Sequence, residues 1–380
     1  MRILAVTGTR ADWGLLVPIL TLLRADPRFE LEIAVTGQHL MPGSPSLDAI
    51  GKDSFEVDHH IDMGLTKDDS SKALTQAMGL CVAGSGAVFD KSKPDLCLVL
   101  GDRYEMLCVV SAALMSRVPV AHLCGGDLTY GAFDDAIRHA ITKMSALHFV
   151  TNADAARRVQ QLGEDPAHVI VSGSPGIDRI LAQPIVARDE FLAEVGLHRD
   201  SEFILVSFHP ETLSTDKAEQ LSGLMEALAA YPEVGLLLSG SNADPGGRAI
   251  DHAFAAIAQD RKNAVFHASL GSRLYFSAMA HASLLLGNSS SGLYEAPSFG
   301  IPTVNVGDRQ AGRPRASSVI DCAAEPAAIK KAIERALSLD CRDVENPFGD
   351  GRAAEIIVET LAQIDRPAKL IKKTFRDFAA

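Results

Sequence analysis

Short apolar runs that end in turn residues recur along the chain, and segments of helical length separate them. The runs are rich in valine, isoleucine and leucine and mostly do not alternate with polar residues, as expected of parallel strands buried on both faces. They predict strands over residues 3–7, 31–36, 96–100, 118–123, 146–150 and 169–171, followed by 203–208, 234–238, 264–266, 283–286 and 303–306. Because strands and helices alternate, the pattern indicates a doubly wound α/β fold.

The strand series restarts after a polar, helix-prone link over residues 182–200, which indicates two domains. A chain of 380 residues is also too long for one ordinary hydrophobic core. We therefore expect two Rossmann-like domains with parallel sheets, over residues 1–181 and 201–360. The basic amphipathic segment 361–380 is expected to form a last helix that packs on the first domain, and Pro367 would break or start that helix.

Composition and charge argue against nucleic-acid-binding, membrane-spanning and zinc-binding proteins. Hydrophobic residues make up 47% of the chain and charged residues 22%, which is typical of a soluble globular protein. The net charge of −12 argues against a nucleic-acid surface, and no window approaches the roughly 18 apolar residues of a membrane span. The first apolar run is too short for a signal peptide, and the six cysteines show no zinc spacing. We expect a cytoplasmic protein with buried thiols at Cys97 and Cys108.

A small-residue turn over residues 287–292 connects the apolar run 282–286 to the start of a helical segment. A helix N-terminus offers unpaired N–H groups and a partial positive charge, which together bind anions. Gly287 and Gly292 would let the backbone approach a ligand closely, and Glu295 is placed to accept two ribose hydroxyls. The alternative is an ordinary strand-to-helix junction in which the serines are N-caps.

Ligands of doubly wound folds bind beyond the carboxyl ends of the strands, so the residues just after each predicted strand are candidates. These positions include Arg10, Asp102, Asp127, Asp134 and His209. Several carboxylates at one edge suit acid/base chemistry, because crowded carboxylates push each other's pKa values apart. The alternatives are surface or structural ion pairs for the charged groups and a structural role for the lone histidine.

Three further polar residues are spaced so that they share one face of a helix. Asp135, Arg138 and His139 stand at positions i, i+3 and i+4 of a predicted helix. This spacing predicts an ordinary surface ion pair for part of the cluster.

These segments resemble the UDP-N-acetylglucosamine 2-epimerase family, and within it the hydrolysing branch of sialic-acid synthesis. The matching motifs lie over residues 6–12, 101–105, 138–145, 161–164, 208–213, 240–244, 287–295, 307–310, 312–313 and 317–320. They occur in order over about residues 1–330, so the match is much more specific than a single glycine-rich turn. The resemblance implies two Rossmann-like domains of the glycosyltransferase-B type, with the active site in the cleft between them.

Hydrolysing members of the family convert UDP-GlcNAc and water to ManNAc and UDP, and they require no metal or cofactor. The resemblance implies that Ser289, Ser290 and Gly292 hold the diphosphate and that Glu295 holds the ribose hydroxyls. His209 would lie near the pyrophosphate and stabilise the leaving UDP.

The resemblance also implies roles in the chemical step. Arg10 would stabilise the leaving UDP from the facing domain, and Arg313 is a weaker candidate for this role. Asp102 and Asp134 match acidic positions that take part in proton transfer. The C2 proton is weakly acidic, so its removal must accompany loss of the phosphate at C1, which requires a base and nearby cations. The resulting 2-acetamidoglucal then receives water at C1 and a proton at C2 from the opposite face.

The chain departs from the family pattern at two positions. Members commonly carry an acid or histidine where Cys124 stands and a glutamate where Asp127 stands. The shorter Asp127 either alters the proton-transfer geometry or leaves room for a bulkier sugar. Cys124 is either a passive filler beside Gly125 or a contact that selects a sugar substituent. The choice of C2 base among Asp102, Asp127 and Asp134 stays open.

The leading hypothesis is a hydrolysing UDP-GlcNAc 2-epimerase, expected as a homodimer or homotetramer with a UDP-sugar as its small-molecule partner. The nearest alternative hydrolyses UDP-N,N′-diacetylbacillosamine, in which the chemistry at C1 and C2 is the same. A non-hydrolysing epimerase is disfavoured by the segment over residues 138–145. A glycosyltransferase on the same scaffold and a non-catalytic nucleotide-sugar binder are the alternatives from other classes.

Overall fold

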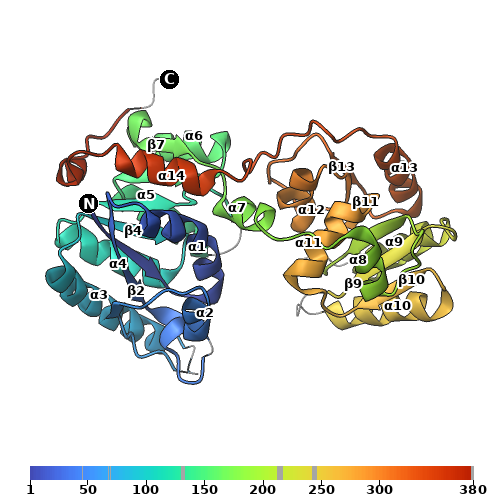
Figure 1. Cartoon of the computed structure of the whole chain (residues 1–380), viewed down its shortest axis with the longest axis horizontal. Coiled ribbons are helices and arrows are strands. Elements are labelled where there is room, and N and C mark those ends of the chain that lie inside the picture. Colours follow the sequence, from blue (N-terminus) through green and yellow to red (C-terminus); the bar gives the residue numbers. More distant parts are fainter. Residues whose placement is uncertain are drawn as a thin grey trace. The chain divides into compact units, whose positions relative to one another are not determined.

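The chain folds into two compact units, each built on its own parallel sheet. The computed structural model describes residues 1–44, 46–66, 68, 70–129, 133–211, 217–241 and 246–377. The first unit consists of Met1–Arg179 together with the segment from Gly351 onward, and the second unit is Ile180–Asp350 (Figure 1). This architecture confirms the predicted pair of doubly wound, Rossmann-like α/β domains.

The sheet of the first unit has seven strands within the described residues, in the order β3-β2-β1-β4-β5-β6-β7, and neighbouring strands are parallel. The strands are β1 (Arg2–Thr7), β2 (Glu30–Val35), β3 (His59–His60), β4 (Leu96–Leu100), β5 (Val120–Leu123), β6 (Leu147–Val150) and β7 (Val169–Val171). The strand order reverses direction between β1 and β4. Their carboxyl ends are therefore the topological switch point, where doubly wound folds bind ligands.

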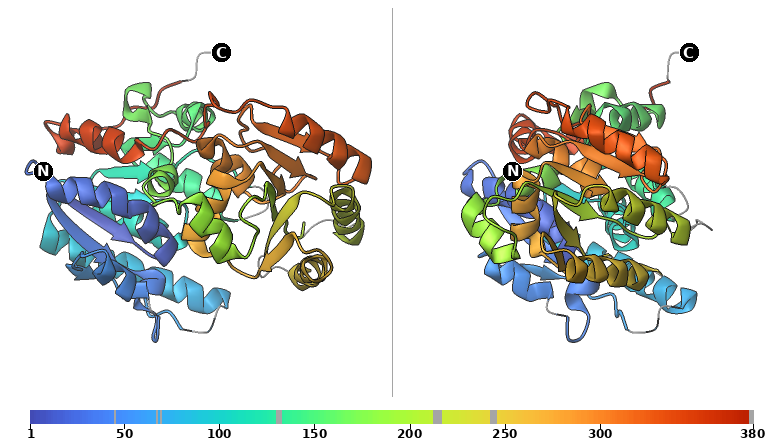
Figure 2. Two further views of the ribbon diagram at one scale, coloured as in Figure 1. Left: turned by 45° about the vertical axis from the view of Figure 1, so that its right-hand side comes forward. Right: turned by 90° about the vertical axis from the view of Figure 1, so that its right-hand side faces the viewer.

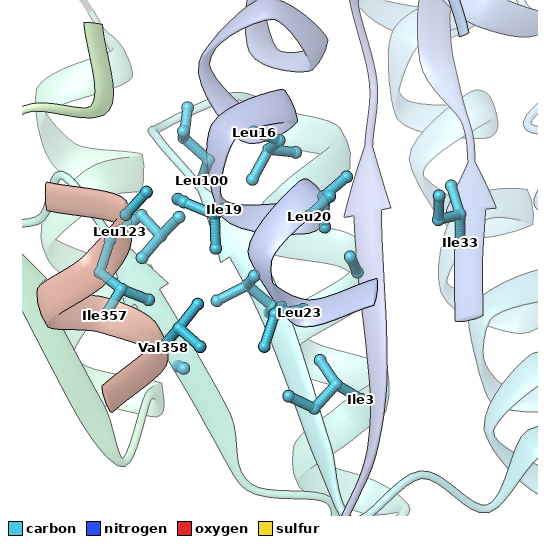
Figure 3. Packing of buried hydrophobic residues seen from close by; sticks show 14 of the residues in the cluster. Ile3, Leu16, Ile19, Leu20, Leu23, Ile33, Leu100, Leu123, Ile357 and Val358 are labelled. Carbon is cyan, nitrogen blue, oxygen red and sulfur yellow. The ribbon is translucent and has the colours of Figure 1, made fainter. Parts of the chain in front are cut away.

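Helices cover both faces of this sheet. The helices with their bounds are α1 (Arg10–Ala25), η1 (Gly37–Leu40), α2 (Ser46–Lys52), α3 (Ser71–Ser92), α4 (Tyr104–Met115), α5 (Phe133–Met144), α6 (Ala153–Gln161), η2 (Pro166–His168), α7 (Pro175–Leu181), α14 (Ala353–Ala362) and η4 (Pro367–Ile371). Helices α1 and α14 pack on one face, and α3, α4 and α5 pack on the other. Ile3 contributes to the first of these cores (Figure 3) and its neighbour Leu4 to the second, so successive residues of β1 are buried on opposite faces.

The second unit has the same layered plan. Its sheet has six strands within the described residues, in the order β10-β9-β8-β11-β12-β13, and neighbouring strands are again parallel. They are β8 (Phe203–Ser207), β9 (Gly235–Ser239), β10 (Ala264–His267), β11 (Leu284–Gly287), β12 (Thr303–Val306) and β13 (Val319–Cys322). The helices are α8 (Arg188–Val195), α9 (Lys217–Ala229), α10 (Gly247–Asp260), α11 (Gly271–His281), α12 (Ser291–Tyr294), η3 (Ala296–Phe299) and α13 (Pro326–Leu337). Helices α9, α10 and α13 pack on one face (Figure 2), and α8 and α11 pack on the other.

The units divide the chain differently from the boundaries expected from the sequence. Helix α8 lies in the expected link, yet its Phe191 packs in the core of the second unit beside Phe203. Helix α14 lies partly in the segment assigned to the second domain, but its Ile357 and Val358 pack against α1 of the first unit (Figure 3). The apolar face of α14 is buried by this packing, which explains why the chain returns to the first unit.

The expected last helix over residues 361–380 is wrong for the described part of that segment. Helix α14 ends at Ala362, and only the short 3-10 helix η4 follows. Pro367 is the first residue of η4, where its missing N–H costs no helical hydrogen bond. The proline therefore starts a new turn instead of continuing α14.

The segment after η4 is anchored to the first unit by Lys373. Its Nζ donates to the carbonyl oxygens of Lys143 (2.8 Å) and Ser145 (2.5 Å) and lies 2.6 Å from Glu164 Oε2. The buried Glu164 also accepts from Lys143 Nζ at 2.8 Å and lies 3.0 Å from His148 Nε2. Burial alone would raise the pKa of Glu164, but the hydrogen bonds from His148, Lys143 and Lys373 lower it to about 2.

Replacement of Lys373 by alanine is expected to lower the free energy of unfolding of the first unit by about 1–3 kcal/mol, because a buried carboxylate loses a charged donor. The pKa of Glu164 is lower in the folded chain than in the unfolded chain. Its interactions therefore stabilise the fold above its unfolded pKa of about 4.3 and are lost as the pH falls toward its folded pKa. Urea denaturation should show the mutational difference at neutral pH and a smaller difference in acid.

The exposed neighbour Lys372 supplies the matched control, since Lys372→Ala removes the same charge but none of the bonds that Glu164 receives from Lys143, His148 and Lys373. Equal effects of the two substitutions at neutral pH would contradict the anchoring role of Lys373.

Candidate active site

Asp102 lies just beyond β4, at the carboxyl edge of the first sheet. The preceding Gly101 has a φ of +83°, which glycine adopts readily and other residues do not. His122 Nε2 lies 2.7 Å from the Gly101 carbonyl, and His122 Nδ1 lies 3.2 Å from Thr142 Oγ1. Burial lowers the pKa of His122 to about 3, so the ring is neutral, donates from Nε2 and accepts at Nδ1. This buried hydrogen-bond chain holds the turn that presents Asp102.

Arg138 of α5 is ion-paired with Asp102. Its side chain is only 6% exposed, and it also donates to the carbonyl oxygen of Asp127. The predicted surface ion pair is therefore wrong for Arg138, although the expected neighbour Asp135 lies 3.4 Å away. The half-buried His139 faces the same carboxylate at 3.5 Å, as the helical spacing predicts.

Asp127 follows the glycine turn after β5, and its carboxyl group is held by Thr151. Thr151 Oγ1 donates to Asp127 Oδ1 at 2.9 Å. Burial raises the pKa of Asp127, although the Thr151 hydroxyl and the nearby Arg138 oppose this effect. A buried carboxyl group with a raised pKa is suited to act as a general acid near neutral pH.

Cys124 begins the same turn, with a φ of +62°. Its side chain packs against the apolar core on the α1 face of the first sheet. Burial raises the pKa of its thiol, and the nearby Asp127 and Asp102 add to the effect. A neutral thiol packed against apolar side chains favours the passive-filler interpretation of Cys124.

Asp134 and Arg10 lie at the first turns of helices that follow sheet strands. Asp134 is the second residue of α5 and is half-buried, and Arg10 is the first residue of α1 and is exposed. Both therefore lie on the carboxyl edge of the sheet, as predicted. The contacts described above join Asp102 to the Asp127 turn but include neither Asp134 nor Arg10.

The charged groups that follow Asp102 form a buried cluster at the switch point. Arg103 Nε donates to Glu105 Oε1 at 2.5 Å, and the Glu105 side chain is fully buried. A Cβ on Gly8 would lie 2.7 Å from Glu105 Oε1, so this carboxylate needs a glycine at the end of β1. Burial raises the pKa of the neighbouring Asp12. Arg103 and Glu105, both within the motif over residues 101–105, therefore form a structural ion pair.

In the second unit, a pocket of about 400 Å³ lies at the carboxyl ends of β8 to β11. It is lined by Ser207, His209, Ser239, Gly240, Ser241, Ala268, Ser269, Leu270, Gly271, Ser272, Tyr275, Ser289 and Ser291. Serine hydroxyls and backbone N–H groups at strand ends are suited to bind phosphate oxygens. Of these residues, the prediction assigned roles to His209 and Ser289, and the motifs over residues 240–244 and 287–295 contain Gly240, Ser241 and Ser291; the other lining residues were missed. The residues after β9 and β10 also directly follow strands, which is the criterion that identified His209.

His209 is held at the pocket by a reciprocal pair of hydrogen bonds. Its N–H donates to Asn288 Oδ1 at 2.7 Å, and Asn288 Nδ2 donates to its carbonyl at 2.8 Å. The His209 ring lies 3.4 Å from Ser241 Oγ through Nδ1. The ends of β8 and β11 are thus joined, and the imidazole lies beside the serines of the pocket.

The glycines of the serine turn are required by the protein's own packing. Gly287 has a φ of +143°, and a Cβ there would lie 2.0 Å from the Ser207 carbonyl oxygen. A Cβ on Gly292 would lie 2.6 Å from Thr303 Cγ2. The predicted reason for both glycines, room for a ligand, is therefore not needed to explain them.

The helix that follows the turn is much shorter than the sequence indicated. Helix α12 spans only Ser291–Tyr294, and the 3-10 helix η3, which contains Pro297, follows it. One turn carries a smaller dipole than a full helix, so the hydroxyl groups matter more for anion binding. Ser290 occupies the N-cap position without a side-chain capping hydrogen bond, but Ser289 Oγ accepts from the N–H of Ser291, the first residue of α12, at 3.4 Å. The alternative of a capped junction is therefore supported for Ser289 and not for Ser290.

Glu295 and Tyr275 carry buried polar atoms whose hydrogen bonding is incomplete. Glu295 Oε2 and the Tyr275 hydroxyl have no hydrogen bond of good geometry among the described residues, although the Ser291 hydroxyl lies near both groups and those of Ser207 and Ser289 lie near the phenol. Burial raises the pKa of both groups, and Glu295 lies close enough to Tyr275 to raise the pKa of the phenol further. Unpartnered buried polar groups cost about 1–3 kcal/mol each, so they mark a place where a ligand would supply the missing bonds.

Arg313 is connected to the serine turn through Gln310. Its Nη1 donates to Gln310 Oε1 at 2.8 Å, and Gln310 Nε2 donates to the Asn288 carbonyl at 2.8 Å. Arg313 also opposes the rise in the pKa of Glu295. This residue is therefore a cation close to the predicted ribose and phosphate residues.

Several parts of the predicted site lie outside the described residues, namely Thr212 and Leu213 of one motif and 242–244 of another. Within the described part of the chain, no group of three or more His, Cys, Asp or Glu side chains is arranged to hold a metal ion. In the same residues, no helix is both long and apolar enough to cross a membrane.

The family model described as "UDP-N-acetylglucosamine 2-epimerase" matches residues 21–362 of the chain. The polysialic acid biosynthesis protein P7 of Escherichia coli is 34% identical over 385 residues, which cover 99% of this chain and 97% of the relative. The GDP/UDP-N,N′-diacetylbacillosamine 2-epimerase (hydrolyzing) of Campylobacter jejuni is 37% identical over 328 residues, or 84% of each chain.

Solved structures show the same fold. The crystal structure of UDP-GlcNAc 2-epimerase from Neisseria meningitidis bound to UDP-GlcNAc superimposes with a TM-score of 0.77. The alignment covers 96% of this chain and 100% of that chain at 21% identity.

Proposed function

The chain belongs to the UDP-N-acetylglucosamine 2-epimerase family. From that premise we propose that it is a hydrolysing 2-epimerase, which converts UDP-GlcNAc and water to ManNAc and UDP. One observation carries the proposal. A buried arginine, Arg138, joins Asp102 to the Asp127 turn at the edge of the sheet where doubly wound folds bind ligands. Two carboxyl groups in different environments are what an elimination followed by a hydration requires.

The second unit binds the UDP part of the substrate in this proposal. The serine hydroxyls of the pocket hold the diphosphate, and His209 and Arg313 supply further donors beside it. Glu295 accepts the ribose hydroxyls through Oε2, whose hydrogen bonding is incomplete among the described residues. The Tyr275 hydroxyl in the pocket wall, which has no hydrogen bond of good geometry among the same residues, supports this assignment.

The carboxyl groups of the first unit transfer the protons. We assign Asp102 as the base that takes the C2 proton while the C1–O bond to the diphosphate breaks, which yields 2-acetamidoglucal and UDP. Water then bonds to C1 through its oxygen and gives up one proton to the solvent, while C2 receives a proton on the opposite face, so that the glucal double bond is saturated. Asp127 is assigned as that acid because burial raises its pKa. Asp134 is retained as a further proton-transfer candidate, and Arg10 as a cation for the leaving UDP.

A second substrate is favoured by a specific observation. The Campylobacter jejuni relative, at 37% identity, is named for GDP/UDP-N,N′-diacetylbacillosamine, whose sugar carries an additional substituent at C4. The aspartate at position 127 is one methylene shorter than the glutamate common in the family, and a bulkier sugar is one of the two consequences expected of that difference. The reaction at C1 and C2 would be unchanged.

Proton NMR of the purified protein with UDP-GlcNAc in D2O is expected to show free ManNAc with deuterium at C2, together with UDP. The deuterium follows from the mechanism, because the proton added at C2 comes from solvent. A parallel tube with UDP-N,N′-diacetylbacillosamine tests the second substrate. Turnover of UDP-N,N′-diacetylbacillosamine alone would make it the proposed substrate in place of UDP-GlcNAc. No turnover of either nucleotide sugar would contradict the proposal of a hydrolysing epimerase.

The proposal extends to assembly and compartment. The described cysteines are all free thiols, and Cys97 and Cys108 are buried as expected, which suits a reducing cytoplasm. Large apolar side chains are exposed on the neighbouring helices α3 and α4, among them Leu80 and Met115. These side chains are candidates for a subunit interface of the proposed homodimer or homotetramer, which sedimentation analysis would distinguish from a monomer.

A further inference from the structure

We propose that Arg138 is a positioning residue that sets where the two proton-transferring carboxyl groups lie relative to each other. The inference rests on the proposed function, because it assigns a role within that reaction. It gives Arg138 no direct contact with the substrate.

The Arg138 guanidinium binds acceptors from three separate segments. Nη2 donates to Asp102 Oδ2, beyond β4, and to Thr129 Oγ1 at 2.8 Å, beyond β5. Nη1 donates to the Asp127 carbonyl at 2.8 Å and to Asp135 Oδ1 of α5 at 3.4 Å. One rigid, planar group therefore connects the end of β4, the turn after β5 and the first turns of α5.

These contacts occupy the terminal nitrogens of the guanidinium. Each terminal nitrogen carries two hydrogens, and each makes two bonds to protein acceptors. No N–H at that end is left over for a phosphate oxygen of the substrate. The geometry thus separates Arg138 from the arginines that bind diphosphates directly.

Burial makes the arrangement depend on arginine. The Arg138 side chain is 6% exposed, and a buried charge is tolerated only when it is paired and hydrogen-bonded. A lysine has the same charge but three donors on one atom, so it cannot bind four acceptors spread around a planar fork. The cluster is further fixed because the Thr129 N–H donates to Asp135 Oδ1 at 2.8 Å.

Arg138 holds Asp102 and Asp127 in different ways, and this affects the chemical step. Asp102 is held through its own carboxylate, whereas Asp127 is held through its backbone carbonyl and keeps its carboxyl group on Thr151. Loss of the guanidinium would let these two groups move independently. A displacement on the order of 1 Å is enough to lower a rate about 100-fold, because proton transfer needs close alignment.

The test compares Arg138→Lys and Arg138→Gln with Arg157→Gln. Arg157 is an exposed arginine of α6 whose ion pair with Asp154 lies within one helix. We expect both Arg138 variants to lose about 100-fold in kcat, with the KM for UDP-sugar and the UDP affinity within about threefold of the wild type. The pH profile of kcat/KM should also shift in both Arg138 variants, because the environment of Asp102 and Asp127 changes. Arg157→Gln should match the wild type throughout.

Wild-type kcat and an unchanged pH profile in Arg138→Lys would overturn the proposal. If Arg138→Gln fails to fold, Thr129→Val removes one acceptor alone and should still lower kcat about tenfold without changing the melting temperature. Wild-type kcat in that variant would also overturn it.

A readout that needs no turnover separates this inference from the proposed function. Amide hydrogen exchange over residues 125–129, measured without substrate, should be faster in Arg138→Gln than in Arg157→Gln. Faster exchange with no activity in the wild type would contradict the proposed function and leave only the structural part of the inference, that Arg138 holds the turn over residues 125–129. Equal exchange would count against the positioning role, whatever the wild type does.

Discussion

Replacement of Asp102 by asparagine is expected to abolish the release of UDP from the substrate, with a loss of about 10²- to 10⁴-fold in kcat. Asparagine has nearly the same shape but cannot accept the C2 proton, and its amide group cannot form the ion pair with Arg138. The UDP affinity should be retained, because the proposed UDP residues belong to the second unit. A coupled assay of UDP release, together with calorimetric titration of UDP, measures the two quantities separately.

Asp154→Asn is the matched control for this substitution. Asp154 is an exposed carboxylate of α6, and among the ion pairs described it pairs only with Arg157. Loss of the Asp154 charge should therefore leave kcat unchanged. Turnover at the wild-type rate in Asp102→Asn would remove Asp102 from the mechanism and return the role of base to Asp127 or Asp134.

Replacement of Glu295 by glutamine is expected to weaken UDP binding by about 10- to 100-fold, with little change in kcat at saturating substrate. The reason is that a charged acceptor of two ribose hydroxyls is lost, and hydrogen bonds to charged groups contribute about 1.5–3 kcal/mol. The effect should depend on pH. Burial raises the pKa of Glu295, so the wild-type carboxyl group becomes protonated, and loses its advantage, at a higher pH than an exposed glutamate would. The ratio of the two affinities should therefore approach one in acid.

Two comparisons make this prediction specific. Glu345→Gln changes an exposed glutamate of the second unit and should leave UDP binding unaltered. With 2′-deoxy-UDP as the ligand, the difference between the wild type and Glu295→Gln should shrink, because one of the two hydroxyls is absent. Unchanged UDP affinity in Glu295→Gln would leave Glu295 with only a structural role at the end of α12.

The predicted strands agree with the observed ones because buried parallel strands leave a strong local signal. The predictions over residues 96–100, 169–171 and 303–306 coincide with β4, β7 and β12. The two missed strands lie at sheet edges, where β3 has only two residues and β13 contains the exposed Asp321. Short edge strands bury less surface, and so their sequences carry less of the apolar pattern.

Part of the candidate site follows from the strand pattern. Doubly wound folds expose their binding residues directly after strands, so Asp102, His209 and Ser289 can be named once the strands are known. The same reasoning applied to the ends of β9 and β10 would have added Ser241 and Ser269. The role of Gly287 needed the structure, since the atom that excludes a side chain there is the Ser207 carbonyl on another strand.

The sequence by itself determined the presence of two α/β units, their described strands other than the edge strands β3 and β13, and the family. Apolar periodicity and ordered motifs carry this information because they are properties of neighbouring residues. Only the tertiary structure decided that Arg138 is buried and bound to Asp102, 36 residues away in the chain. It also decided that α14 belongs to the first unit. The physical reason is the same in both cases. Helical spacing shows which side chains share a face, but the partner of that face is set by contacts between segments that are distant in sequence.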